Sequence, residues 1–220
     1  MSVKYWGDPV SQPCRTVEYV LRKCKVDYEN NFAEIFKVTR TEEYKKDVNP
    51  RGHIPTLEHD GTKIYESAAQ IRYLLDTFDK EEVLLPRKDL KARSKVDSLL
   101  DWNNTTVRPT LTGALKKIKL NTAVFGSPAA TEEEEKEEMA KVHSLMEEIE
   151  ELLGDKKFLT GDDMSISDVQ IYNEVELCKA ILSLDLDKYG KLNKWRDLIS
   201  QDELVKALDE EMNKRLSEMA

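Results

Sequence analysis

A change of pattern near residue 90 is the feature that most constrains the fold of this chain. Before it, short β-prone runs alternate with short helical patterns, whereas from about Leu90 onward almost every segment has the period of a helix. A mixed segment followed by an all-helical one predicts two domains, and 220 residues are enough for both. We therefore expect a first domain over residues 1–80, a linker over 81–89 and an all-helical domain over 90–220.

The first 80 residues have the pattern of a small α/β module. β-prone runs predict strands over Val3 to Trp6 and Tyr28 to Phe32, and a later pair joined by Asp60-Gly61 predicts a hairpin. Apolar residues from Cys14 to Cys24 recur at a helical period and form one stripe. The expected order is β-α-β-α-β-β-α, in which the other two helices lie over Glu42 to Val48 and Glu66 to Thr77.

The rest of the chain predicts a helical bundle. Apolar residues from Met139 to Leu153 step by three and four, and Gly154 follows as a helix stop. Ser165 and Asp168 have the spacing of a capping box, which indicates the start of a further helix. A similar pattern over 200–203 predicts the start of the last helix.

The excess of acidic residues argues against negatively charged partners. Acidic residues outnumber basic ones by 43 to 34, so the formal net charge is −9. A chain of this charge is not expected to bind nucleic acid or an anionic membrane as its main partner. It contains no apolar run near the roughly 20 residues that a membrane-spanning helix requires.

The cysteines and the opening residues indicate a compartment. The three cysteines are odd in number and have neither CxxC nor metal-ligand spacing, which favours a reducing cytoplasm and predicts no metal site. The strand pattern begins within the first few residues, so no signal peptide is expected. We therefore expect a cytoplasmic protein.

Short motifs in the first domain and the helical region occur in an order that is typical of one family. They are the segments 11–15 (SQPCR), 48–57 (VNPRGHIPTL), 66–71 (ESAAQI), 84–86 (LLP), 92–97 (ARSKVD), 102–108 (WNNTTVR) and 165–168 (SISD). Together they resemble the soluble glutathione transferases. Segments 11–15 and 102–108 resemble the theta-like class in particular, although Arg51-Gly52-His53 departs from the lysine pattern of that class.

This resemblance implies a fold and an activity. The first domain is expected to be thioredoxin-like and to bind glutathione, and the helical domain is expected to supply a pocket for the second substrate. The activity implied is that of a glutathione transferase, which conjugates glutathione to small hydrophobic electrophiles or reduces hydroperoxides with it. The resemblance also implies a homodimer, with glutathione as co-substrate and no further cofactor.

The resemblance assigns the catalytic role to Ser11, and its surroundings can supply the required energy. Lowering the pKa of a cysteine thiol from about 8.5 by about 2 units requires roughly 2.7 kcal/mol. A hydroxyl that donates to a charged acceptor contributes about 1.5–3 kcal/mol, and a helix N-terminus adds about 0.3–1 kcal/mol. Ser11 precedes a predicted helix with Pro13 in its first turn, so both effects are expected at one point.

The other site residues are also assigned by resemblance. Glu66 is expected to receive the γ-glutamyl ammonium of glutathione, and Ser67 with its backbone amide the α-carboxylate. Ile54, before a cis Pro55, is expected to pair its backbone with the cysteinyl residue. The remaining assignments are Arg40 and His53 near the glycine carboxylate, and Arg108 near the sulfur and the electrophile.

Simpler interpretations of these residues stay open. Ser11 alone has the position of a plain helix cap, and Arg40 and Arg108 have the pattern of solvated surface charges. Cys14 lies on the apolar stripe, which favours a small core residue over a nucleophile. A non-catalytic scaffold of the same fold, like the first module of a translation elongation factor gamma subunit, is the alternative function. A serine hydrolase is disfavoured because no G-x-S-x-G motif occurs.

Overall fold

The structure is a computed structural model that describes residues 2–219, and its chain divides into two compact units. One unit comprises Met1–Asp89 together with Asp202–Ala220, and the other comprises Leu90–Gln201. The expected boundary near residue 90 therefore coincides with a division in packing. The last helix differs from the sequence-based division, which assigned it to the domain over 90–220, because its contacts lie with the first unit.

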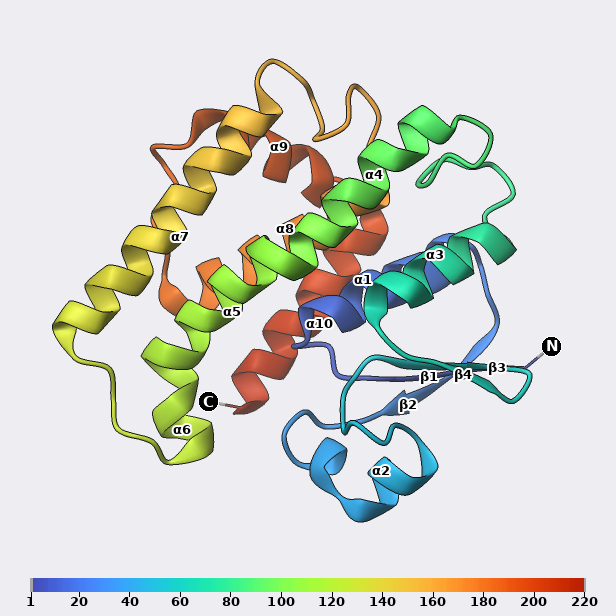
Figure 1. Ribbon diagram of the computed structural model, residues 1–220, viewed down its shortest axis with the longest axis horizontal. Helices are drawn as coiled ribbons and strands as arrows, with labels where there is room; N and C mark the ends of the chain where they lie inside the picture. The colour runs from blue at the N-terminus through green and yellow to red at the C-terminus, as the bar shows by residue number, and fades with distance from the viewer. Residues whose placement is uncertain (1, 220) are drawn as a thin grey trace. The chain divides into compact units, whose positions relative to one another are not determined.

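The first unit is built on a mixed sheet of four strands (Figure 1). Its strands are β1 (Val3–Gly7), β2 (Tyr28–Phe32), β3 (Thr56–His59) and β4 (Thr62–Ile64). Their order across the sheet is β2-β1-β3-β4, in which β1 and β2 are parallel and the two other pairs are antiparallel. The hairpin between β3 and β4 turns at Asp60 and Gly61, both with positive φ, as the sequence predicts.

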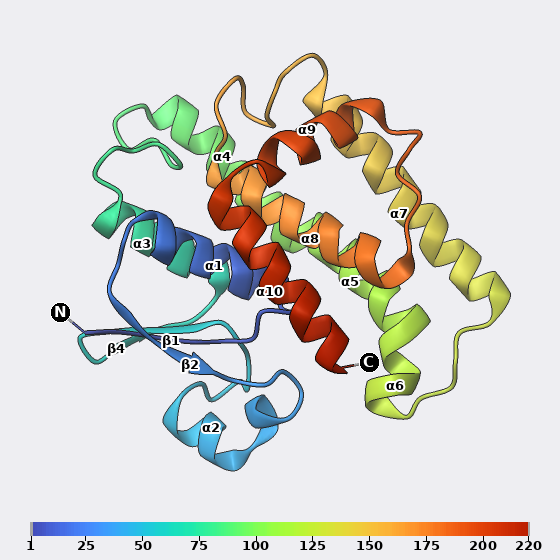
Figure 2. The same cartoon turned by 180° about the vertical axis from the view of Figure 1, so that it is seen from behind.

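Helices cover both sides of this sheet, and they occur in the predicted order β-α-β-α-β-β-α. Helices α1 (Gln12–Lys23) and α3 (Ser67–Phe78) pack together on one side, and α2 (Glu42–Asp47) lies on the other (Figures 1 and 2). One short 3₁₀ turn, η1 (Val38–Arg40), precedes α2. The core between sheet and helices contains the fully buried side chains of Tyr5, Val17, Leu21, Leu57, Ile71 and Leu74.

The last helix, α10 (Glu203–Met219), packs along α1 within the first unit (Figure 2). Its buried face consists of Val205, Leu208 and Met212. Two ion pairs fix it to the C-terminal half of α1: Arg22 to Glu211 at 2.9 Å and Lys23 to Asp202 at 2.9 Å. An apolar stripe and matched charges therefore hold α10 against α1.

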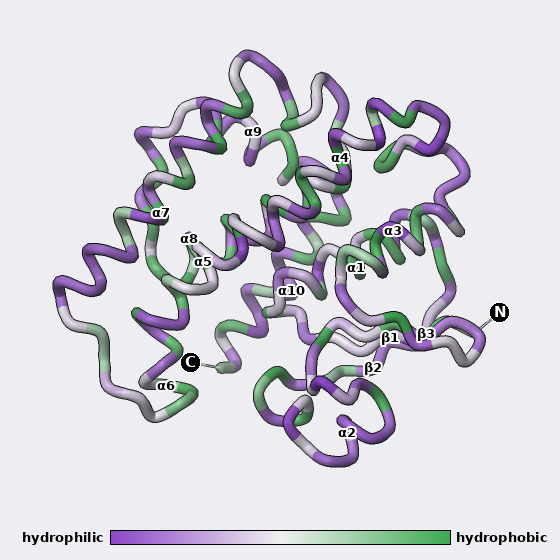
Figure 3. Tube along the Cα trace, in the orientation of Figure 1, coloured by the Kyte–Doolittle hydropathy of each residue, from purple (hydrophilic) through white to green (hydrophobic). Residues whose placement is uncertain are grey.

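The second unit consists of helices. The first of its segments form one continuous helical run: α4 (Leu90–Trp102), a π-helical turn over Asn103–Val107, α5 (Arg108–Leu115), a second π-helical turn over Lys116–Leu120, and α6 (Asn121–Phe125). Then follow α7 (Glu132–Leu153), α8 (Ile166–Leu182) and α9 (Gly190–Ser200). Figure 3 shows the acidic start of α7 as hydrophilic, while α8 is buried along most of its length. No helix within 2–219 is both long enough and apolar enough to cross a membrane.

The predicted capping box at the start of α8 is present, and it extends further than the sequence indicates. The carboxylate of Asp168 is fully buried and accepts the backbone N–H of Ser165 at 2.9 Å. It also accepts the Ser165 hydroxyl at 2.6 Å, the backbone N–H of Leu159 at 2.8 Å and the indole N–H of Trp195 at 2.9 Å. One carboxylate thereby joins α8, α9 and the loop before them.

Candidate functional site

The strand register brings the main predicted site residues of the first unit to one edge of the sheet. Trp6 near the end of β1 pairs with Thr56 at the start of β3, because these strands are antiparallel. The loop that carries Ser11 therefore leaves the sheet beside Pro55. Strand β4 is antiparallel to β3, so its end, which leads to Ser67, lies at the same edge. The N-termini of α1 and α3 both start from this edge, and helix N-termini favour anionic groups.

Ser11 occupies the N-cap position of α1 and is only 3% exposed. Its backbone N–H donates to the carbonyl of Asp8 at 2.9 Å, and its carbonyl accepts the N–H of Arg15 at 3.1 Å. Its hydroxyl does not cap the helix; it is hydrogen-bonded to the side chain of Cys14 instead. The backbone alone thus fixes Ser11 at the helix start, and the hydroxyl serves another contact.

Cys14 is a core residue, as its place on the apolar stripe predicts. Its side chain is completely buried, and burial raises the pKa of its thiol to about 11, although the hydrogen bond from Ser11 acts in the opposite direction. A thiol with this pKa is protonated at neutral pH and has no access to a substrate. The geometry therefore disfavours Cys14 as the nucleophile.

The backbone of the loop before β3 is fixed by a cis peptide and by hydrogen bonds from neighbouring side chains. The Ile54–Pro55 peptide is cis, in agreement with the sequence-based expectation. The carbonyl of His53 accepts the hydroxyl of Tyr44 at 3.0 Å and the side-chain amide of Asn49 at 3.0 Å. The side chain of His53 is exposed, so its imidazole is accessible at the surface while its backbone is fixed.

Glu66 and Ser67 form the turn into α3. Glu66 has a positive φ of 65°, an uncommon conformation for a residue with a side chain, and this directs the turn. Its side chain is 71% exposed and pairs with Arg51 at 3.0 Å. Ser67 is the first residue of α3 and is half-buried. Both residues thus stand where the helix N-terminus meets solvent.

Gln70 is a positioning residue that sequence reasoning did not single out. Its side chain is completely buried, and its amide donates to the carbonyl of Pro55 at 2.9 Å and to that of Ile64 at 2.8 Å. Its backbone N–H donates to the carbonyl of Glu66 at 3.0 Å. Gln70 therefore joins the cis-proline loop to the turn before α3. The available signal was its place in the segment 66–71, one turn after Glu66.

The two arginines of the predicted site lie in different settings. Arg40 is exposed on η1, and its guanidinium lies over the ring of Phe36 at 5.3 Å. Arg108 belongs to the second unit, where it pairs with the buried carboxylate of Glu174 at 2.7 Å. Arg40 thus has the exposure of a surface charge, whereas Arg108 is anchored in an ion pair that the sequence pattern did not predict.

Comparison with known proteins agrees with this fold. Residues 6–82 match the family model described as glutathione S-transferase, N-terminal domain, and residues 114–217 match glutathione S-transferase, C-terminal domain. Glutathione S-transferase theta-1 of Homo sapiens is 28% identical over 182 residues, which cover 80% of this chain and 72% of that protein. Glutathione S-transferase T1 of Arabidopsis thaliana is 28% identical over 203 residues, which cover 89% of this chain and 82% of that protein.

A solved structure gives the same result at the level of the fold. The apo form of human glutathione-S-transferase T1-1 superposes with a TM-score of 0.86 at 24% identity, covering 96% of this chain and 88% of that one. Its likeness extends over both units, as do the two matching family models. The chain therefore belongs to the glutathione S-transferase family and is a theta-like glutathione transferase with a thioredoxin-like first domain.

Proposed function

We propose that this protein binds glutathione at the sheet edge of the first unit, stabilises its thiolate with the Ser11 hydroxyl, and transfers it to small hydrophobic electrophiles or uses it to reduce hydroperoxides in the cytoplasm. The observation that carries the proposal is the meeting of three features at one edge: Ser11 at the start of α1, the cis Pro55 loop, and Ser67 at the start of α3. The matches to both glutathione S-transferase domain models support glutathione as the substrate.

The thiolate is stabilised by a hydroxyl and by a helix N-terminus. A serine hydroxyl has one proton that rotates, so it can donate to a bound sulfur in place of its contact with Cys14. Such a donor to a charged acceptor contributes about 1.5–3 kcal/mol, and the N-terminus of α1 adds about 0.3–1 kcal/mol. The nucleophile is then the sulfur of the substrate, and no cofactor is required.

The rest of glutathione would be held by the surrounding loops. Glu66 would accept a hydrogen bond from the γ-glutamyl ammonium. Its carboxylate is accessible from solvent, because the side chain stays exposed in its ion pair with Arg51. Ser67 would donate to the α-carboxylate at the N-terminus of α3. The backbone of Ile54 would pair with the cysteinyl residue. The proposal further assigns the glycine carboxylate to Arg40 and His53, and the electrophile side to Arg108.

Replacing the hydroxyl tests the mechanism. We expect Ser11→Ala to fold, to retain glutathione within a few-fold of the wild-type affinity, and to lose about 2–3 kcal/mol of thiolate stabilisation. This corresponds to a rate of conjugation that is roughly 30- to 150-fold lower at neutral pH. Ultraviolet titration of bound glutathione would show thiolate absorbance appearing at higher pH, and dinitrochlorobenzene and cumene hydroperoxide serve as probe substrates for the rate.

Cys14→Ala is the matched control, because Cys14 is one helical turn away and contacts the same hydroxyl. We expect it to keep most of the conjugating activity and to lose about 1 kcal/mol of stability. A folded Ser11→Ala protein that titrates bound glutathione as wild type does would contradict the role of Ser11. A wild-type protein that binds immobilised glutathione but converts neither probe substrate would favour the non-catalytic scaffold.

We further propose that the protein is a homodimer, as is typical of its family. Light scattering at micromolar protein concentration is expected to give a mass of twice 25.4 kDa. A mass equal to that of one chain would contradict the dimer and would leave the proposed chemistry of the first unit intact.

A further inference from the structure

A buried carboxylate organises the loop that carries Ser11. Asp8 lies between β1 and α1 and is 1% exposed. Its side chain accepts the backbone N–H of Val10 at 3.2 Å and that of Ile35 at 3.0 Å. Its carbonyl accepts the N–H of Ser11 at 2.9 Å. The position of Ser11 at the helix start therefore depends on the position of Asp8.

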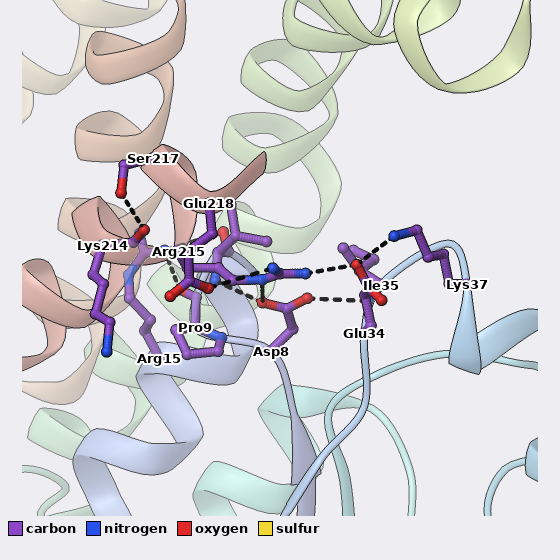
Figure 4. A network of polar contacts seen from close by, with 11 residues as sticks. Asp8, Pro9, Arg15, Glu34, Ile35, Lys37, Lys214, Arg215, Ser217 and Glu218 are labelled. Atoms are coloured by element: carbon purple, nitrogen blue, oxygen red, sulfur yellow. Dashed lines mark hydrogen bonds and ion pairs between the residues drawn. The ribbon is translucent and has the colours of Figure 1, made fainter. Parts of the chain in front are cut away.

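Arg215 of α10 binds this carboxylate from the other end of the sequence (Figure 4). Its Nε donates to Asp8 at 3.3 Å, and its Nη2 donates to Glu34 in the loop after β2 at 2.9 Å. The Arg215 side chain is only 13% exposed. Lys37 also pairs with Glu34 at 2.9 Å, and hydrogen bonds from Lys37 and Arg215 hold the pKa of Glu34 below its usual range. One guanidinium thus joins α10 to two loops of the first unit.

The charge of Arg215 matters because of where Asp8 lies. A buried negative charge three residues before Ser11 repels any anion held at the start of α1, and such repulsion raises the pKa of a thiol. The guanidinium compensates the charge of Asp8 in the same contact that fixes its position. The other titratable or charged groups around the loop are Tyr5 on β1, Cys14, Arg15 and Glu18 on α1, Glu34 and Lys37 after β2, and Glu218 on α10.

We propose that Arg215 is a positioning residue for the thiolate site, which holds Asp8 and the Ser11 loop in place and compensates the carboxylate charge beside the bound sulfur. This inference rests on the proposed role of Ser11, and it adds a residue of the last helix to that site. It assigns to α10 an indirect influence on the reactivity of glutathione, which acts through Asp8 and without contact with the substrate.

The test compares Arg215→Met with two matched variants in the full-length protein. Lys214→Met removes one positive charge from the next position of α10, where the side chain points away from Asp8 in Figure 4. Arg22→Met removes the bidentate tie between α1 and α10 at Glu211, together with the hydrogen bond from Arg22 to Glu18, and leaves the hydrogen bonds of Asp8 in place. Arg215→Lys restores the charge, although a single ammonium cannot reproduce both directional bonds of the guanidinium.

Two readouts are required, one with glutathione and one without. Ultraviolet titration gives the pKa of the bound glutathione thiol. Hydrogen exchange of the backbone amides of Asp8, Val10, Ser11 and Ile35, measured in the protein without glutathione, reports whether the loop is held. The double variant Asp8→Asn/Arg215→Met removes the carboxylate charge together with its counterion.

We expect Arg215→Met to raise the thiol pKa by about one unit, which leaves roughly tenfold less thiolate at neutral pH. The loop amides are expected to exchange faster. Both values should stay at wild-type level in Lys214→Met and Arg22→Met, and Arg215→Lys should recover part of the pKa. Asp8→Asn/Arg215→Met should return the thiol pKa toward wild type, because the uncompensated charge is gone.

Wild-type thiol pKa and wild-type exchange in Arg215→Met would overturn the inference. An equal change in Arg22→Met would also overturn it, because the effect would then come from general loosening of α10. These outcomes differ from a failure of the proposed function, in which the wild-type protein itself shows no lowered pKa for bound glutathione. In that case the exchange of the loop amides still decides whether Arg215 holds the Ser11 loop.

Discussion

Two buried carboxylates, one in each unit, receive their hydrogen bonds from different kinds of donor. Asp168 in the second unit is surrounded by neutral donors: two backbone N–H groups, a hydroxyl and the indole of Trp195. Asp8 in the first unit accepts two backbone N–H groups and the guanidinium of Arg215. Because Asp168 is satisfied without a cation, burial alone does not require one at Asp8.

The cation beside Asp8 has a role that Asp168 does not require. A carboxylate that serves only as a structural anchor can keep its charge within a shell of neutral dipoles. A carboxylate beside an anion site repels the anion unless a positive charge compensates it. In the proposed function Asp8 lies beside an anion site, whereas Asp168 is only a structural anchor. The two sites therefore make different predictions for stability, reactivity and pH dependence.

The largest expected effect is on stability, at Asp168. Replacing it in Asp168→Ala leaves the buried N–H groups of Leu159 and Trp195 without an acceptor, which predicts a loss of about 3–5 kcal/mol in the free energy of unfolding. Urea denaturation followed by circular dichroism measures it. Asp185→Ala is the control, because Asp185 is exposed and its one hydrogen bond among residues 2–219 is accepted from the N–H of Asp187.

We also expect the folded fraction of Asp168→Ala to keep the thiol pKa of bound glutathione seen in the wild type, in contrast to a change at Asp8. A loss below 1 kcal/mol would break the comparison, since Asp168 would then not be the anchor that its four donors indicate. A changed thiol pKa in that folded fraction would also break it, because a purely structural carboxylate has no influence on the sulfur.

The smallest expected effect is on stability at acidic pH, through the ion pair between Lys23 of α1 and Asp202 before α10. Burial acts to raise the pKa of Asp202, but its hydrogen bond with Lys23 and those from the N–H groups of Leu204 and Val205 leave it below the usual value near 3.8. A folded-state pKa below the unfolded one gives stability that is complete above about pH 4 and is lost as the pH falls through the lower value. Partly exposed pairs of this kind contribute about 0.2–1 kcal/mol.

The corresponding measurement is the difference in unfolding free energy between wild type and Lys23→Met as a function of pH. The difference is expected to be constant from pH 7 to about pH 5 and to shrink as the pH falls below the usual range of aspartate. A difference that stays the same at pH 2.5 would mean that the Lys23–Asp202 pair does not contribute through charge.

Local sequence patterns predicted much of the fold because local physics determines it. The Asp60-Gly61 turn follows from residues that adopt positive φ, and the start of α8 follows from a capping box. The site edge follows from the strand order, since a hairpin and a parallel pair leave few arrangements of β1 and its neighbours. The cis isomer of Pro55 does not follow from a local pattern; its prediction rested on the family resemblance alone.

Contacts between distant residues were outside the reach of such patterns. Arg215 and Asp8 are 207 positions apart, and nothing in the periodicity of α10 identifies the partner of Arg215. The same applies to Arg108 with Glu174, and to the grouping of α10 with the first unit. The π-helical turn over Asn103–Val107 precedes Pro109, which has no N–H to continue the regular ladder. Its exact register depends on packing against neighbours.

The division of the first unit into two stretches of chain has a consequence for synthesis. A ribosome makes residues up to Asp89 early and α10 only after the whole of Leu90–Gln201. At about 5–20 residues per second, on the order of ten seconds separates the two. Throughout that interval the sheet and α1 exist without Arg215, and Asp8 has no counterion from α10. Each newly made chain therefore acquires a complete first unit only as α10 emerges, so the order of translation completes the proposed thiolate site last.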